Sequence, residues 1–195
     1  MGLINHQQRW GFSHIPKTGG TSFRQLLKII PDTEVITPPH ISLDGFGDIQ
    51  DYFLFTIVRN PYTKFMSRYF HDKKKGVPHD IDTYIQRYPH NMLEYRRQTF
   101  FINHGERHNR KINFIGRYEN YKQDIDTILQ KLGRQTPHTF PHLNKNSIYN
   151  KQPNLNQQQY YISLLKKKPN VVEFIQTYFE RDFQELNYEL DISKY

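Results

Sequence analysis

The chain has 195 residues and carries 27 lysines and arginines against 19 acidic residues, a formal net charge of +8. This length predicts a single domain spanning residues 1–195, with a substantial core. The positive charge favours anionic partners, which include nucleic acid, membrane surfaces, nucleotides and acidic glycans. The sequence contains no cysteine, which excludes disulfides and metal sites built on thiolates.

Residues 1–9 lack the apolar core of a signal peptide. The longest apolar run, residues 52–58, is too short to span a bilayer. We therefore expect a protein with no integral membrane segment, and a bacterial cytoplasm suits it best. A luminal catalytic fragment separated from its anchor is the alternative.

Residues 9–15 are expected to form a first strand, and residues 20–30 the helix that follows it. Between them lies the segment Lys17-Thr-Gly-Gly-Thr-Ser22. A strand that enters a helix through a glycine-rich turn is typical of phosphate binding, because the free backbone N–H groups and the helix dipole attract an anion. Lys17 precedes the glycines, whereas the lysine of a nucleoside triphosphatase loop follows them. The structural alternative is a glycine turn with a Ser or Thr helix cap.

A short second strand is expected at residues 34–37. The continuous apolar run at 52–58 indicates a strand buried on both faces, as in a parallel sheet. Pro61 then suits the start of a helix over about 62–72. Arg59 and Ser67 stand on either side of this helix start, eight residues apart. Taken alone, Arg59 is a strand end and Ser67 a polar helix position.

Further along the chain, helices are expected near 80–88 and 92–102, a strand at 113–116 and a helix at 119–132. Residues 134–155 are expected to form a long loop, followed by helices at 156–168 and 170–184 that are separated at Pro169. This alternation predicts an α/β fold of three layers, P-loop-like, with a mostly parallel central sheet flanked by helices. Ligands in such sheets bind at the carboxyl ends of the strands, and both the loop at residues 17–22 and Arg59 follow the ends of predicted strands.

Residues 14–23 and 55–69 together resemble the carbohydrate sulfotransferase family, whose enzymes use 3′-phosphoadenosine 5′-phosphosulfate (PAPS). The resemblance implies that the 3′-phosphate is bound by Arg59 and Ser67, with Arg68 as a further helper. A guanidinium fork matches a phosphate well, and a hydroxyl adds one hydrogen bond. It also implies that Lys17 stabilises the oxygen bridging sulfur and phosphorus. The 5′-phosphosulfate would be held by Lys17, Thr18, Gly19, Gly20, Thr21 and Ser22.

The same resemblance implies a base between the loop and the buried strand, an interval in which His40 is the candidate. An imidazole accepts a hydroxyl proton near neutral pH. His14, at the end of the first strand, is the alternative base and also has a structural interpretation. The segment 114–120 resembles a family segment that follows a strand, which implies nucleotide contacts by Arg117 and Tyr118. A weaker resemblance at 141–147 implies a loop near the cofactor, with contacts by Asn144, Lys145 and Ser147.

The predicted function is transfer of a sulfuryl group from PAPS to a hydroxyl of a carbohydrate acceptor. An anionic polysaccharide is one such acceptor. No metal is expected, because the histidines are scattered and Arg59 follows the buried strand where a magnesium-binding acid would stand. The alternatives are a nucleotide or small-molecule kinase, and a non-catalytic nucleotide- or polyanion-binding protein. No nucleic-acid module is recognisable. Residues 76–110 match nothing in the family and are the expected place of acceptor recognition.

Overall fold

The computed structural model describes residues 2–37, 43–47, 49, 51–77, 80–89, 92, 95–103, 111–135 and 156–195. The chain divides into two compact units. The first is formed by residues 1–59 and 98–144, and the second by residues 60–97 and 145–195. The expectation of a single domain stays a prediction.

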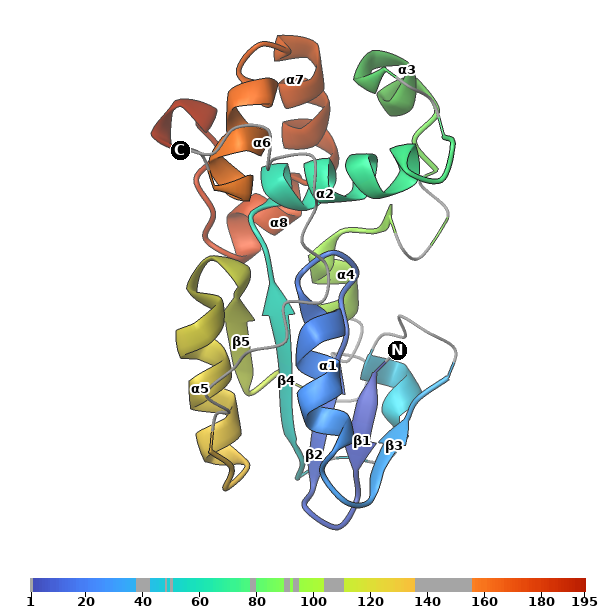
Figure 1. Ribbon diagram of the computed structural model, residues 1–195, viewed down its shortest axis with the longest axis vertical. Helices are drawn as coiled ribbons and strands as arrows, with labels where there is room; N and C mark the ends of the chain where they lie inside the picture. Colours follow the sequence, from blue (N-terminus) through green and yellow to red (C-terminus); the bar gives the residue numbers. More distant parts are fainter. Residues whose placement is uncertain are drawn as a thin grey trace. The chain divides into compact units, whose positions relative to one another are not determined.

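The first unit contains a five-stranded sheet of order β3-β1-β2-β4-β5 (Figure 1). The central strand β4 pairs in parallel with both β2 and β5. At the other edge, β1 pairs antiparallel with β2 and with β3. The strands are β1 (Leu3–Asn5), β2 (Trp10–Ser13), β3 (Thr33–Val35), β4 (Phe53–Val58) and β5 (Phe114–Arg117).

The sheet is therefore mixed: β2, β3, β4 and β5 run in one direction and only β1 runs in the other, so the prediction of a mostly parallel sheet holds for every strand except β1. Strand β1 was not predicted, because its three residues are too few to show a hydrophobic period. A polar turn follows, in which Arg9 has a positive φ of 53°. This turn folds β1 back on β2 as a hairpin, with Leu3 opposite Phe12. The antiparallel half of the sheet arises from this hairpin.

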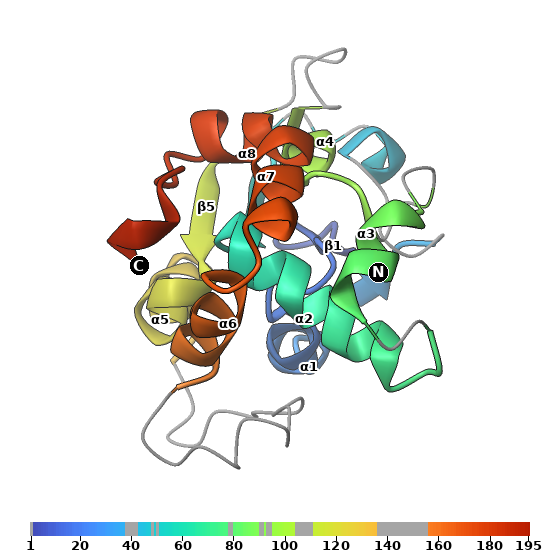
Figure 2. The same cartoon turned by 90° about the horizontal axis from the view of Figure 1, so that it is seen from above.

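Alternation along the strands directs side chains to the two faces of the sheet. One face is covered by α1 (Gly20–Lys28) and α5 (Tyr121–Lys131), which lie on the same side of the strands in both views (Figure 1, Figure 2). The core on this face contains Trp10, Phe12, Phe23, Leu27, Phe55, Ile57, Ile125 and Ile128.

The opposite face is covered by the 3₁₀ turn η1 (Leu43–Phe46), which contacts α4 (Gln98–Asn103). Phe46 packs there with Ile4 and Leu54. All but the first residue of β4 are buried, so this strand is covered on both faces, as its continuous apolar sequence predicts. A further 3₁₀ turn, η4 (Tyr118–Asn120), joins β5 to α5.

The second unit is helical in the part of the chain that the structure describes. Its core is mostly aromatic, with tilted and edge-to-face ring pairs such as Tyr69 and Tyr84, whose centroids lie 5.2 Å apart. The elements are α2 (Pro61–Lys73), α3 (Ile81–Gln86), α6 (Gln157–Leu165), α7 (Pro169–Tyr178), α8 (Glu180–Glu185) and the 3₁₀ turn η6 (Ile192–Lys194).

Most elements lie close to their predicted bounds, with two corrections. The helix predicted at 92–102 begins only at Gln98. The helix predicted at 170–184 is two helices, α7 and α8, which are separated at Phe179. The ring of Phe179 is fully buried in the aromatic core, so tertiary packing interrupts a segment whose local pattern is helical throughout.

Candidate functional site

The loop between β2 and α1 has an unusual backbone for its sequence. Lys17 has φ 68° and Gly19 has φ 86°, so two of its residues are left-handed. Glycine adopts this conformation freely, whereas for lysine it costs of order 1–3 kcal/mol. The loop is held internally, because the Thr18 hydroxyl donates to the carbonyl of Ile15 at 2.9 Å and the Ser22 amide donates to that of Gly19 at 3.2 Å. The strained Lys17 is thus fixed by its surroundings.

The first turn of α1 is open to an anion. Gly19 caps the helix without a side chain, and the first turn contains no acidic residue. Gly20 is required by a close approach, since a Cβ atom there would lie 2.2 Å from Cδ2 of the buried His14 ring. The helix therefore begins at two glycines, with no acidic side chain in its first turn, and its dipole favours a phosphate or sulfate group at this end.

Arg59 follows β4 at the same edge of the sheet and is 3% exposed. Its backbone is fixed by the amide of Gln98: the Arg59 N–H donates to Oε1 at 2.8 Å, and Nε2 donates to the Arg59 carbonyl at 2.7 Å. The guanidinium lies 3.4 Å from the carbonyl oxygen of Lys17 and 4.2 Å from the ring centroid of Tyr118. The carboxyl ends of two neighbouring parallel strands thus bring Lys17 and Arg59 together.

Two tyrosines that follow β5 close the other side of the loop. Tyr121 donates its hydroxyl to the carbonyl of Gly19 at 2.7 Å. A Cβ atom on Gly19 would lie 2.8 Å from ring carbons of both Tyr118 and Tyr121, so only glycine fits between them and the loop. Burial raises the pKa of Tyr121 above its usual value, which keeps the hydroxyl protonated as a donor. Arg117, half-buried at the end of β5, is fixed through its N–H to the Asp124 carboxylate at 2.6 Å.

The first unit therefore gathers most of the residues that the sequence singles out. Lys17 is half-buried, Thr18 and Ser22 are buried, and Thr21 is exposed at the first turn of α1. Gln98 and Tyr121 were not predicted. Gln98 stands in a segment without a recognisable motif, and the sequence offers no signal for it. Tyr121 shares its segment with Tyr118, and its proximity to a predicted nucleotide contact was the only available signal.

The remaining predicted residues belong to the second unit or lie outside the described residues. Ser67 is half-buried, whereas every other residue from 61 to 70 in α2 is buried. Arg68 donates to the Asp72 carboxylate at 2.9 Å and to the Tyr95 hydroxyl at 2.9 Å, so its side chain is engaged within the second unit. His40, Asn144, Lys145 and Ser147 lie outside the described residues.

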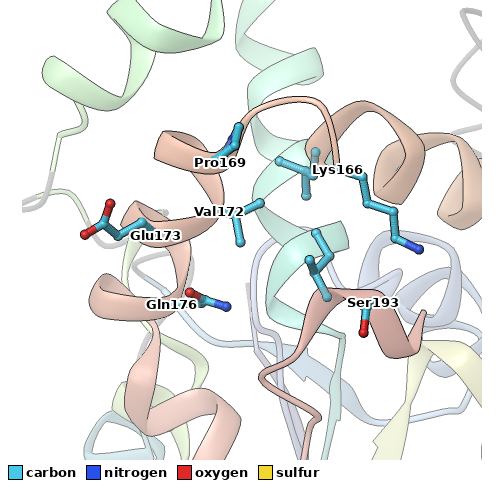
Figure 3. Close-up of a pocket in the computed structure, with 8 residues that line it drawn as sticks. Lys166, Pro169, Val172, Glu173, Gln176 and Ser193 are labelled. Carbon is cyan, nitrogen blue, oxygen red and sulfur yellow. The ribbon is translucent and has the colours of Figure 1, made fainter.

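A groove of about 340 Å³ lies in the second unit, where Pro169 and Val172 of α7 lie across from Lys166 and Ser193 (Figure 3). None of the residues predicted from the sequence lines it. Within the described ranges, no group of three or more His, Asp or Glu side chains is placed to hold a metal ion. The helices found there are all too short or too polar to cross a membrane. The expectation of a metal-free reaction stays a prediction.

Comparison with known proteins gives one match. Residues 3–189 match the model of the sulfotransferase family. No curated protein and no solved structure gives a match. The matched segment includes β1 to β5, the loop before α1, Arg59 and α2. Because the match covers nearly the whole chain, the protein belongs to the sulfotransferase family.

Proposed function

We propose that the protein transfers a sulfuryl group from PAPS to a hydroxyl of a carbohydrate acceptor, on a three-layer, P-loop-like fold. One observation carries the proposal. At the carboxyl ends of β2 and β4, the open first turn of α1 and the ammonium-bearing Lys17 lie beside the buried guanidinium of Arg59. A donor with two separate anionic groups on one nucleotide matches a site with two separate cationic centres.

The residues of the first unit fit such a donor. Gly19 and Gly20 place no side chain at the start of α1, and the loop supplies backbone N–H groups and a lysine. We assign the 5′-phosphosulfate to Lys17, Thr18, Gly19, Gly20, Thr21 and Ser22. We assign the 3′-phosphate to Arg59 and Ser67, and further nucleotide contacts to Arg117 and Tyr118. When bound, the donor supplies a sulfuryl group attached to a phosphate that can leave.

The chemistry assigned to the chain is acid–base and electrostatic. His40 would accept the proton of the acceptor hydroxyl as its oxygen forms the new bond to sulfur. The bond from sulfur to the bridging oxygen breaks, and the ammonium of Lys17 would neutralise the charge that develops on that oxygen. The products are a sulfate ester, adenosine 3′,5′-bisphosphate and a proton on His40. Positioning and charge stabilisation account for this reaction without a metal.

The test is mass spectrometry of a panel of neutral and anionic glycans after incubation with the protein and PAPS. A sulfate adduct on a glycan, formed only with both protein and donor, is the expected result. His40→Ala should abolish the adduct while calorimetry still detects binding of adenosine 3′,5′-bisphosphate. The matched control is His6→Ala, which changes an exposed histidine bonded to Tyr52 and should leave transfer unchanged. If no glycan is sulfated while a nucleotide is phosphorylated in the presence of ATP and Mg²⁺, the protein is a kinase instead.

A further inference from the structure

Tyr118 and Tyr121 touch both halves of the proposed donor site. Their ring centroids lie 5.6 Å apart, and both rings border Gly19. In addition, Tyr121 donates its hydroxyl to the Gly19 carbonyl, and the ring of Tyr118 lies under the guanidinium of Arg59. The pair therefore contacts the loop assigned to the 5′-phosphosulfate and the arginine assigned to the 3′-phosphate.

The bond from Tyr121 helps to fix the direction of one amide group, together with the Ser22 amide that donates to the same Gly19 carbonyl at 3.2 Å. The carbonyl of Gly19 and the N–H of Gly20 belong to one planar trans peptide, so they point in opposite directions. Gly19 is left-handed and has no side chain to restrict rotation of this peptide. With its oxygen held by the Tyr121 hydroxyl at 2.7 Å, the Gly20 N–H must point away from Tyr121. A residue 102 positions later in the chain thus adds a second restraint on the first amide of α1.

Tyr118 restrains Arg59 by a different contact. A guanidinium is planar and stacks on an aromatic face, so a ring 4.2 Å from Cζ restricts both the position and the tilt of the fork. The second restraint is the Lys17 carbonyl, 3.4 Å from one terminal nitrogen. A fork with a fixed plane loses less freedom when it binds a phosphate than a mobile one.

We propose that Tyr121 and Tyr118 are positioning residues of the donor site, Tyr121 for the amide that meets the 5′ group and Tyr118 for the guanidinium that meets the 3′-phosphate. This inference rests on the proposed function for the identity of the ligand. It assigns the two tyrosines effects on separate parts of the nucleotide. A tyrosine that only fills the core would tolerate replacement by phenylalanine, which keeps the ring, without loss of affinity.

The experiment is calorimetry with adenosine 3′,5′-bisphosphate and with 5′-AMP. Tyr121→Phe keeps the ring and should weaken both ligands by the same factor, about three- to tenfold, because the hydroxyl loses its bond to the Gly19 carbonyl and its contacts with Ser22 and Phe23. Tyr118→Leu should weaken the bisphosphate by about three- to tenfold more than 5′-AMP, because the contact with Arg59 affects only the 3′-phosphate. Tyr118→Phe keeps the aromatic face and should behave as the wild type. Tyr52→Phe, which removes a tyrosine hydroxyl bonded to His6 elsewhere in the first unit, is the control.

A second readout does not depend on any nucleotide. In the ligand-free protein, Tyr121→Phe should accelerate amide hydrogen exchange in residues 17–22, while Tyr52→Phe leaves it unchanged. Unchanged exchange there, or unchanged affinity for both ligands, would overturn the role of Tyr121. The role of Tyr118 is overturned if Tyr118→Leu weakens 5′-AMP as much as the bisphosphate, or if Tyr118→Phe behaves like Tyr118→Leu. A wild type without preference for the bisphosphate contradicts the proposed function and the role of Tyr118 together, and hydrogen exchange then decides the role of Tyr121.

Discussion

Two helices of this protein follow neighbouring parallel strands, yet they begin in opposite ways. After β2, α1 begins at a left-handed Gly19 that supplies no side-chain cap. After β4, α2 begins at Asn60, whose side chain accepts from the amides of Tyr62 at 2.9 Å and Thr63 at 3.4 Å. Pro61 then occupies the first position of α2, where its missing N–H costs nothing.

The difference shows that two strand–helix units of the same kind can serve different purposes. The Gly-Gly pair gives the first amides of α1 no side-chain cap, whereas the Asn-Pro pair satisfies those of α2 within the protein. The basic residues that precede the two caps also differ. Lys17 belongs to a strained loop two residues before Gly19, and Arg59, directly before Asn60, contributes its side chain. We therefore expect α1 to bind through its backbone and the end of β4 to bind through one guanidinium.

The largest effect should follow from changing Lys17. Lys17→Ala should reduce turnover at saturating donor by about a hundredfold or more, as expected when a preorganised charge at a leaving oxygen is lost. Lys17→Arg should not restore it, because a planar fork cannot replace a compact ammonium at one oxygen. The control is Lys28→Ala, at the exposed end of the same helix. Near-normal turnover in Lys17→Ala would show that the loop is only a structural turn.

The buried cation of the second unit should affect stability instead of binding. Lys64 is 3% exposed and donates to the carbonyl of Arg96 at 3.1 Å. Burial lowers its pKa to about 8, with Asp182 opposing the shift and Arg68 adding to it. Below pH 8 the lysine is charged in both states, and the folded protein bears the cost of burying it. Between pH 8 and 10.5 only the unfolded state stays charged, so this lysine makes stability rise with pH.

Urea unfolding of the wild type and Lys64→Met across this range measures the effect. Between pH 8 and 10.5, the unfolding free energy of the wild type should rise by up to about 3 kcal/mol relative to that of Lys64→Met. This follows from about 1.4 kcal/mol for each unit by which the pKa is lowered. The tyrosines ionise in both proteins and largely cancel in this difference. A difference that stays constant with pH would contradict the buried charge, and loss of nucleotide affinity at pH 7 would place Lys64 in the site.

A smaller effect is expected at the cap of α2. Asn60→Ala should lower the free energy of unfolding by about 1 kcal/mol, because two amides lose their acceptor. Asn60→Asp keeps the oxygen and should restore most of the stability. Affinity for adenosine 3′,5′-bisphosphate should change less than twofold in both variants, measured by calorimetry. If Asn60→Ala instead loses affinity for the bisphosphate, the start of α2 takes part in binding.

The sequence analysis predicted the parts of this protein in which local pattern and function coincide. The continuous apolar run at 52–58 indicated a buried strand, which β4 confirms, and Lys17 to Ser22 indicated a glycine turn at a helix start, which the start of α1 confirms. The phosphate-binding role of that turn stays a prediction. Short or tertiary features were missed. β1 has three residues, Gln98 acts through a contact 39 positions away, and Tyr121 through one 102 positions away. Such contacts leave no periodic trace, since the chain itself brings the partners together only on folding.

The central claim is that Arg59 recognises a 3′-phosphate. The most direct test is titration of the wild type, Arg59→Ala and Arg59→Lys with adenosine 3′,5′-bisphosphate, 5′-AMP and ATP, without added Mg²⁺. A charge-assisted hydrogen bond contributes roughly 1.5–3 kcal/mol, and about 1.4 kcal/mol is tenfold in affinity. The wild type should therefore bind the bisphosphate at least about tenfold more tightly than 5′-AMP.

Arg59→Ala should lose most of that preference while its affinity for 5′-AMP stays nearly unchanged, and Arg59→Lys should lie between the two. The control is Arg9→Ala, which removes an exposed arginine paired with Asp51. Equal affinity of the wild type for the bisphosphate and 5′-AMP would contradict the account, and so would a ranking of the three nucleotides by charge alone.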